Sequence, residues 1–72
     1  MDKNKVLELI KILRTTMSLS QSAIASKIGM SPSFYGMIER GERTLSFEHF
    51  CKIAEALECA PADLLMILEK YN

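Results

Sequence analysis

The groups that could carry out catalysis or hold a metal are few in this sequence. The single histidine, His49, has no nucleophile or carboxylate pair at a recognisable spacing, and the chain has no glycine-rich phosphate loop. Cys51 and Cys59 form no zinc-site spacing with His49, and we expect them to be buried free thiols that act as small apolar residues. The sequence therefore predicts a protein that is not an enzyme and that needs no metal or cofactor.

Binding of an anionic partner is the chemistry that the charge distribution allows. The formal net charge is +0, which argues against a simple polycation. Residues 1–45 hold seven Lys and Arg residues against four Asp and Glu residues, a net charge of +3, whereas residues 46–72 hold two against five, a net charge of −3. Such asymmetry can direct one end of the molecule to a polyanion, although ordinary solvated charge explains it equally well.

Helical periodicity dominates the chain and must position these charges. Apolar residues recur at steps of three and four residues, as in an amphipathic helix. Residues typical of helix boundaries punctuate the pattern: Ser20, Ser31 and Ser46 as caps, Pro32 and Pro61 at first positions, and Gly29 and Gly41 at ends. Five helices are predicted, over residues 3–17, 21–28, 32–40, 47–57 and 61–71. In the fourth, Phe47 is predicted to share the inward face with Phe50.

The helices are predicted to form one all-α domain over residues 1–72. No alternating apolar pattern of strand length, glycine-serine linker, low-complexity run or internal repeat interrupts them. The N-terminal segment contains Glu8 and Lys11 and is not a signal peptide, and no apolar run approaches membrane-spanning length. We expect a soluble, cytoplasmic protein with no membrane partner.

The segment from Gln21 to Arg40 has a two-turn helix, a glycine turn and a second capped helix, which is the outline of a helix-turn-helix. Ile24 and Ile28 stand at core positions, and the small Ala25 allows the two helices to approach closely. The segments LSQ at 19–21, IERGER at 38–43 and FCKIAEALECAPADLL at 50–65 extend the pattern, which covers about 60 of the 72 residues. In these features the chain resembles the phage-repressor/Xre-like family of helix-turn-helix DNA-binding proteins.

This resemblance implies a compact five-helix lambda-repressor-like fold and assigns roles to several polar residues. It implies a partly buried ion pair between Arg14 and Glu39, for which two solvated charges are the alternative. It also implies DNA phosphate contacts near the N-termini of the second and third helices, by Gln21, Lys27, Arg40 and Arg43. Each of these four side chains is otherwise an ordinary solvated group.

The third helix departs from the family pattern at the positions that face DNA bases. By residue order these base-reading positions are Ser31, Pro32, Ser33, Gly36 and Met37, where related repressors present Gln, Arg, Lys or Asn. Since no bidentate partner for guanine or adenine is available, we expect readout by serine hydroxyls, by apolar contact with thymine methyl groups and by DNA shape. Gly36, expected on the exposed side, indicates a close approach of DNA or of a neighbouring side chain. Phe34 either adds to the apolar contact or packs against the second helix.

The fifth helix carries more apolar residues than one face needs. On a helical wheel Leu64, Ile67, Leu68 and Tyr71 form one stripe, whereas Leu65 and Met66 point elsewhere. A chain of 72 residues buries only about 60% of the surface that its unfolded form exposes. We therefore expect residues 61–71 to form a two-fold homodimer interface through Leu65 and Met66, with a core that covers both stripes as the alternative.

Together these features predict a small transcriptional regulator that binds double-stranded DNA as a homodimer on a near-palindromic operator, through a motif at about residues 21–40. Chains of this kind resemble phage repressors, antitoxin-type regulators and controller proteins of restriction-modification systems. The resemblance thus points to a bacterial or phage origin, and no small-molecule effector is expected. The alternative is a protein-interaction module of antitoxin or adaptor type, in which the apolar stretch SPSFYGM docks a partner protein.

Overall fold

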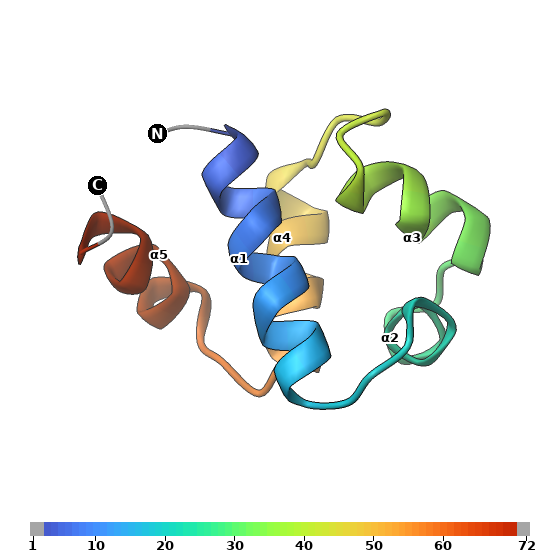
Figure 1. Ribbon diagram of the computed structural model, residues 1–72, viewed down its shortest axis with the longest axis horizontal. Coiled ribbons are helices and arrows are strands. Elements are labelled where there is room, and N and C mark those ends of the chain that lie inside the picture. Colours follow the sequence, from blue (N-terminus) through green and yellow to red (C-terminus); the bar gives the residue numbers. More distant parts are fainter. Residues whose placement is uncertain (1–2, 71–72) are drawn as a thin grey trace.

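The computed structural model describes residues 3–70, which form five α-helices and no strand (Figure 1). The helices are α1 (Lys3–Thr16), α2 (Gln21–Lys27), α3 (Pro32–Glu39), α4 (Phe47–Ala56) and α5 (Pro61–Lys70). The predicted all-α fold class and the order of its helices are confirmed, and the first four helices each end one residue earlier than predicted. Tyr71, the predicted last residue of the fifth helix, lies outside the described residues.

Serine hydroxyls begin three of the helices, as the sequence predicts. The Oγ atoms of Ser20, Ser31 and Ser46 accept hydrogen bonds from the backbone N–H groups three residues later, at 3.0, 3.1 and 3.1 Å. Each bond satisfies an N–H group that has no partner within its helix. Between α2 and α3 the chain turns at Gly29, whose φ of 70° lies in the left-handed region that glycine adopts at little cost. Caps and turn together fix where α3 starts relative to α2.

The core lies around α1 and α4, which stand between α5 and the α2–α3 pair (Figure 1). Its least exposed large side chains come from all five helices: Ile10, Ile24, Tyr35, Ile38, Ile53 and Leu64. Ile24 and Ala25 of α2 and Tyr35 and Ile38 of α3 are fully buried, so the two helices of the motif are held by one apolar seam. Each large side chain buried in this way contributes about 1.5–3 kcal/mol.

Helix α5 buries one side and exposes the other. Leu64 and Leu68 are buried and Ile67 is half-buried, so the stripe that contains them is the one that faces the core. Leu65 is half-buried and packs against the core, whereas Met66 is 57% exposed. The two residues expected to point away from the stripe are therefore exposed to different degrees.

Two expectations about burial are wrong. Phe47 is 75% exposed, because the first turn of α4 lies at the rim of a groove beside α5, while Phe50 one turn later is buried. Cys51 and Cys59 are free thiols, but both are half-buried rather than buried. No three His, Cys, Asp or Glu residues within the described range gather where they could hold a metal ion. In the same range no helix combines the length and the apolar character that a membrane crossing requires.

Candidate nucleic-acid interface

A buried ion pair ties α1 to the C-terminal end of α3. The Arg14 Nε donates to Glu39 Oε2 at 2.8 Å, and its Nη2 donates to Glu39 Oε1 at 2.9 Å. The remaining Nη1 donates to the backbone carbonyl of Leu19, just before α2, at 2.7 Å. This is the pair that the family resemblance implies, and its two side chains are only 9% and 3% exposed rather than solvated. One arginine thus links α1, the segment before α2, and α3.

Two further donors reach the same carboxylate. The Tyr35 hydroxyl donates to Glu39 Oε2 at 2.6 Å, and the Gln21 Nε2 donates to Glu39 Oε1 at 3.3 Å. With these partners the buried carboxylate has its hydrogen-bonding capacity used, as a buried charge requires. No role is predicted from the sequence for the Tyr35 hydroxyl, although the four-residue spacing between Tyr35 and Glu39 is a usable signal. The bond from Gln21 also engages a residue that the sequence assigns to DNA phosphate.

These contacts set the protonation of the network. Burial alone would raise the pKa of Glu39, but the hydrogen bonds from Arg14, Tyr35 and Gln21 outweigh burial and hold that pKa below its ordinary value of 4.5. Burial and the bond to Glu39 raise the pKa of the Tyr35 hydroxyl, so it remains a donor at neutral pH. The same carboxylate, as a hydrogen-bond acceptor, raises the pKa of Arg14. At neutral pH the network therefore holds one carboxylate charge among protonated donors.

The N-terminal part of α3 carries the exposed surface on which the sequence places base contacts. Ser31, Pro32 and Ser33 are exposed, and Met37 is half-buried. At 100° per residue, Ser33 and Met37 lie about 40° apart around the helix, so they share one face of α3. We call these four residues the exposed strip of α3. It offers two hydroxyl groups and apolar atoms but no charge.

Gly36 does not belong to this strip, which corrects the expectation that it lies on the exposed side. It is buried because the side chains of Arg40 and Gln21 cover the place that a Cβ atom would take. The Arg40 Nη1 lies 2.9 Å from that position, and the Gln21 Oε1 lies 3.4 Å from it. In the sequence, Gly36 indicates a close approach of DNA or of a neighbouring side chain. The structure shows the approach of neighbouring side chains.

Two arginines have their guanidinium groups on either side of Ser33 and Met37 of the exposed strip, and each is held by neighbours. The Arg40 Nε donates to Glu42 Oε2 at 2.6 Å, and these side chains are 53% and 54% exposed. The Arg43 guanidinium lies 5.9 Å from the centre of the Phe34 ring, which permits a cation–π interaction. Around α3, Ser33 and Met37 lie between the side of Phe34 and that of Gly36.

Phe34 contacts α4, a neighbour that the sequence alternatives do not name. Its ring meets the His49 ring of α4 edge-on, with ring centres 5.8 Å apart. Phe34 therefore packs α3 against α4, and the Arg43 guanidinium lies over the face of its ring. His49, which the sequence gives no functional role, is half-buried and supports this arrangement.

The four residues expected at phosphate groups are not all brought together. Gln21 and Arg40 meet at Gly36, whereas Arg43 lies apart from them, on Phe34. Lys27 is exposed and lines a depression between α2 and α4, together with Lys52 and Glu55. The structure thus places Lys27 on a different side of α2 from Gln21.

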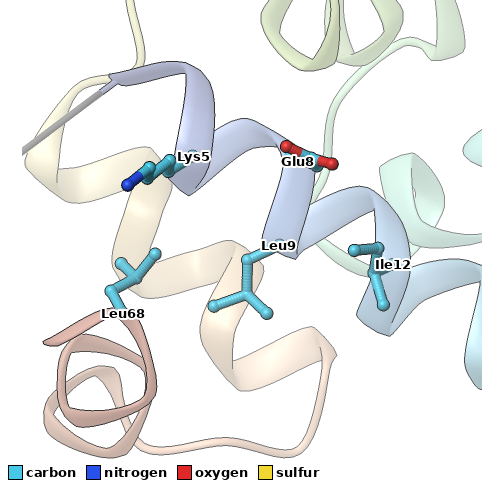
Figure 2. A pocket seen from close by; sticks show the side chains of 5 residues that line it. All are labelled: Lys5, Glu8, Leu9, Ile12 and Leu68. Atoms are coloured by element: carbon cyan, nitrogen blue, oxygen red, sulfur yellow. The ribbon is translucent and has the colours of Figure 1, made fainter. Parts of the chain in front are cut away.

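Two apolar grooves run beside α5. Helix α5 itself lies on the other side of α1 and α4 from α3 (Figure 1). The α1–α5 groove is lined by Lys5, Glu8, Leu9, Ile12 and Leu68, and Figure 2 shows Leu9 and Ile12 on the side of α1 that faces α5. The α4–α5 groove is lined by Val6, Thr44, Leu45, Ser46, Phe47, Phe50 and Leu65. Among the described residues the exposed large apolar side chains are Ile12, Phe47 and Met66. Each groove thus has an exposed apolar residue in its lining.

A helix-turn-helix family model, HTH_3, matches residues 10–64 of the chain. The matched range contains α2, α3, the ion pair between Arg14 and Glu39, and both arginines beside the exposed strip. A search among curated protein sequences finds no significant match.

Solved structures of bacterial proteins share the fold over most of this chain. An XRE-family like protein from Pseudomonas syringae pv. tomato is 26% identical, with a TM-score of 0.89 over 97% of this chain and 85% of that one. The restriction-modification controller protein C.AhdI from Aeromonas hydrophila is 36% identical, with a TM-score of 0.79 over 88% and 96% of the two chains. An HTH_3 family transcriptional regulator from Vibrio cholerae is 32% identical, with a TM-score of 0.77 over 90% of this chain but only 36% of that one.

Proposed function

The chain belongs to the HTH_3 helix-turn-helix family of DNA-binding regulators, and we propose that it controls transcription as a homodimer on a near-palindromic operator. The observation that carries the proposal is the exposed strip of α3, whose Ser33 and Met37 lie between the Arg40 guanidinium at Gly36 and the Arg43 guanidinium at Phe34, on a helix whose other side is fixed in the core. The 36% identity to a restriction-modification controller protein, over 96% of that protein, supports a small controller-type regulator. Such a regulator would work in the bacterial cytoplasm, where its DNA lies.

In this proposal α3 enters the major groove with its exposed strip against the base edges. Ser31 and Ser33 offer hydroxyl groups to several bases, and Pro32 and Met37 offer apolar atoms to the methyl group of thymine. None of these is a bidentate partner for guanine or adenine, so much of the specificity would come from the shape and deformability of the DNA. Gly36 is buried beneath other side chains and is left out of this base contact.

Phosphate contacts would hold α3 in register along the DNA. Arg40 and Arg43 are suited to this because their guanidinium groups lie on either side of Ser33 and Met37, and guanidinium groups bind phosphate oxygens at two points. Gln21 at the start of α2 and the exposed Lys27 are the further phosphate contacts in the proposal. Such contacts set position and affinity rather than sequence preference.

A salt titration with a random-sequence DNA duplex tests this function. Four phosphate contacts from each protomer correspond to about eight per dimer, so log affinity should fall with log salt at a slope of about −7. The competing function, a module whose apolar strip docks a protein, predicts no DNA binding at low salt. That result would overturn the proposed function.

A second copy of the chain would give the two-fold arrangement that a near-palindrome requires. Leu65 and Phe47 line the same groove, and Met66 follows Leu65 on α5 with most of its side chain exposed. We propose that the second copy covers this surface. Recognition helices about 34 Å apart would then meet half-sites about 10 bp apart.

Met66→Lys tests this interface, with Ile12→Lys in the α1–α5 groove as the matched control. Met66→Lys should shift sedimentation toward the monomer and weaken DNA binding, because a charge would be buried between the copies. Ile12→Lys should leave both unchanged. If only Ile12→Lys gives the monomer, the interface lies at the other groove.

A further inference from the structure

Gly36 stands inside α3 without a backbone reason to be glycine. Gly29 and Gly41 adopt positive φ angles, but Gly36 does not. A glycine inside a helix destabilises that helix relative to alanine, because it leaves the unfolded backbone more freedom. Glycine at this position therefore lowers the stability of α3. The side chains around Gly36 supply a reason for its presence.

The space beside Gly36 is taken by the side chain of Arg40, one turn later. From an ideal Cβ position on Gly36, the Arg40 Nη1 lies 2.9 Å away and the Cζ lies 3.7 Å away. The guanidinium therefore folds back along α3 and lies against the glycine, and its Nε is held by Glu42 at 2.6 Å. Even so, the Arg40 side chain remains 53% exposed. It is held in one place while it still faces solvent.

We call the place where the Arg40 guanidinium lies against Gly36 the seat of Arg40. Gln21 connects this seat to the buried network around Glu39. Its Nε2 donates to Glu39 at 3.3 Å, and in that orientation its Oε1 lies 3.4 Å from the Cβ position of Gly36. The Gln21 side chain, which borders the seat, is thus fixed by the Glu39 carboxylate, to which Arg14 and Tyr35 also donate.

We propose that Gly36 is a positioning residue, whose missing side chain lets Arg40 lie flat against α3 in the conformation that binds a DNA phosphate. The proposal rests on the proposed DNA-binding function. A guanidinium held in advance loses less conformational freedom on association than one that moves freely in solvent. Its solvent-facing N–H groups can donate to phosphate oxygens.

Gly36→Ala separates this role from a structural one, because stability and binding should change in opposite directions. The added methyl group would meet the end of a flexible side chain at 2.9 Å, so Arg40 would move away while the helix gains propensity. We expect the melting temperature to rise by about 5 °C. Affinity for a random-sequence duplex should fall about three- to tenfold per protomer, since the arginine must then be ordered on binding. A structural defect would instead lower both quantities.

A double-mutant cycle with Arg40→Ala assigns the loss to that arginine. Arg40→Ala alone should weaken binding to every duplex and reduce the steepness of the salt dependence by about two units per dimer. Adding Gly36→Ala to it should cause no further loss. In a Lys27→Ala background the full loss should persist, because Lys27 lies toward α4 and not at the seat. An undiminished effect of Gly36→Ala without Arg40 would overturn the proposal.

The Arg40 Nε–Hε signal in the NMR spectrum tests the seat in the free protein. It should shift in Gly36→Ala and remain in place in Lys27→Ala. If the signal does not shift, or if Gly36→Ala binds as tightly as the wild type while Arg40→Ala binds weakly, Gly36 does not position Arg40 and the DNA-binding function stands. A wild-type protein that binds no duplex would overturn both.

Discussion

Two carboxylates three residues apart, Glu39 and Glu42, each pair with an arginine, and the two pairs differ in almost everything except distance. Arg14 and Glu39 meet at 2.8 Å with side chains that are 9% and 3% exposed. Arg40 and Glu42 meet at 2.6 Å with side chains that are about half exposed. The contact distance therefore says little about what each pair does, and burial says much more.

The buried pair fixes architecture, because a charge deprived of its partner inside the protein is costly. It joins α1 to α3 and is completed by Tyr35 and Gln21. The exposed pair contributes little to stability, because water and salt screen it. For that reason loss of the bond between Arg40 and Glu42 should leave the fold intact. Glu39 thus holds α3 in the fold, whereas the next residue, Arg40, is proposed to bind DNA.

The largest difference between the pairs should appear when each carboxylate is removed. Glu39→Ala strands Arg14 in the core, and we expect the free energy of unfolding to fall by about 3 kcal/mol. Glu42→Ala should leave it unchanged within the error of urea denaturation, because its partner is solvated. Similar losses in both variants would show that the Glu39 pair is screened like the surface pair.

The dependence of stability on acid pH should also show the contribution of the buried pair. The pKa of Glu39 lies below 4.5 in the folded protein, so the folded state binds fewer protons than the unfolded state in this range. The stability from Glu39 is therefore fully present above the unfolded pKa and is lost as the pH falls through the folded pKa. Wild-type stability should decline more steeply below about pH 4.5 than that of Glu39→Gln, whose side chain does not titrate. Equal slopes would contradict the role of this carboxylate.

Tyr35→Phe should have an intermediate effect. It keeps the buried ring but removes the donor to Glu39 Oε2, which leaves one fewer bond to a buried charge. We expect a loss of about 1–2 kcal/mol in urea denaturation. The acid transition should also move to higher pH, since the hydroxyl helps to keep the pKa of Glu39 low. A more stable variant with an unmoved acid transition would exclude this hydroxyl from the network.

The smallest effect on stability should come from the exposed strip, where binding changes instead. Met37→Ala should lose preference at a thymine position while nonspecific affinity holds, because only the apolar contact with the methyl group is removed. Arg43→Ala serves as the control and should weaken every sequence about equally. The comparison is made by fluorescence titration with duplexes that carry thymine or uracil. If uracil in place of thymine leaves affinity unchanged, the apolar contact does not contribute to readout.

The sequence predicts the helices well because their signals are local. Ser20, Ser31 and Ser46 cap helices through bonds to N–H groups only three residues away, and such bonds need no knowledge of the tertiary fold. The ends of α1 and α4 are less easily predicted. Each is followed by a residue with a positive φ that is not glycine, Ser18 and Glu58, and these residue types do not indicate a helix end. Backbone bonds close both turns, from Leu19 N–H to the Arg14 carbonyl at 3.1 Å and from Cys59 N–H to the Ala54 carbonyl at 2.9 Å, and such bonds do not depend on the residue type.

The candidate site is predicted less completely because side-chain conformation depends on neighbours distant in sequence. Gly36 and Arg40 are one turn apart, but that Arg40 covers the glycine depends on Gln21 and Glu42 as well. The packing of Phe34 on His49 of α4 likewise depends on the path of the loop between α3 and α4. Family resemblance supplies the positions of such residues, and the structure supplies which of them meet.

Selection of bound duplexes from a random-sequence pool by the purified wild-type protein tests the central claim most directly. A homodimer that reads DNA through the exposed strip of α3 should enrich a near-palindrome with half-sites about 10 bp apart. Thymine should be enriched at the positions that Pro32 and Met37 reach, with further preference between the half-sites from DNA deformability. A pool that remains random after repeated selection would contradict sequence-specific binding.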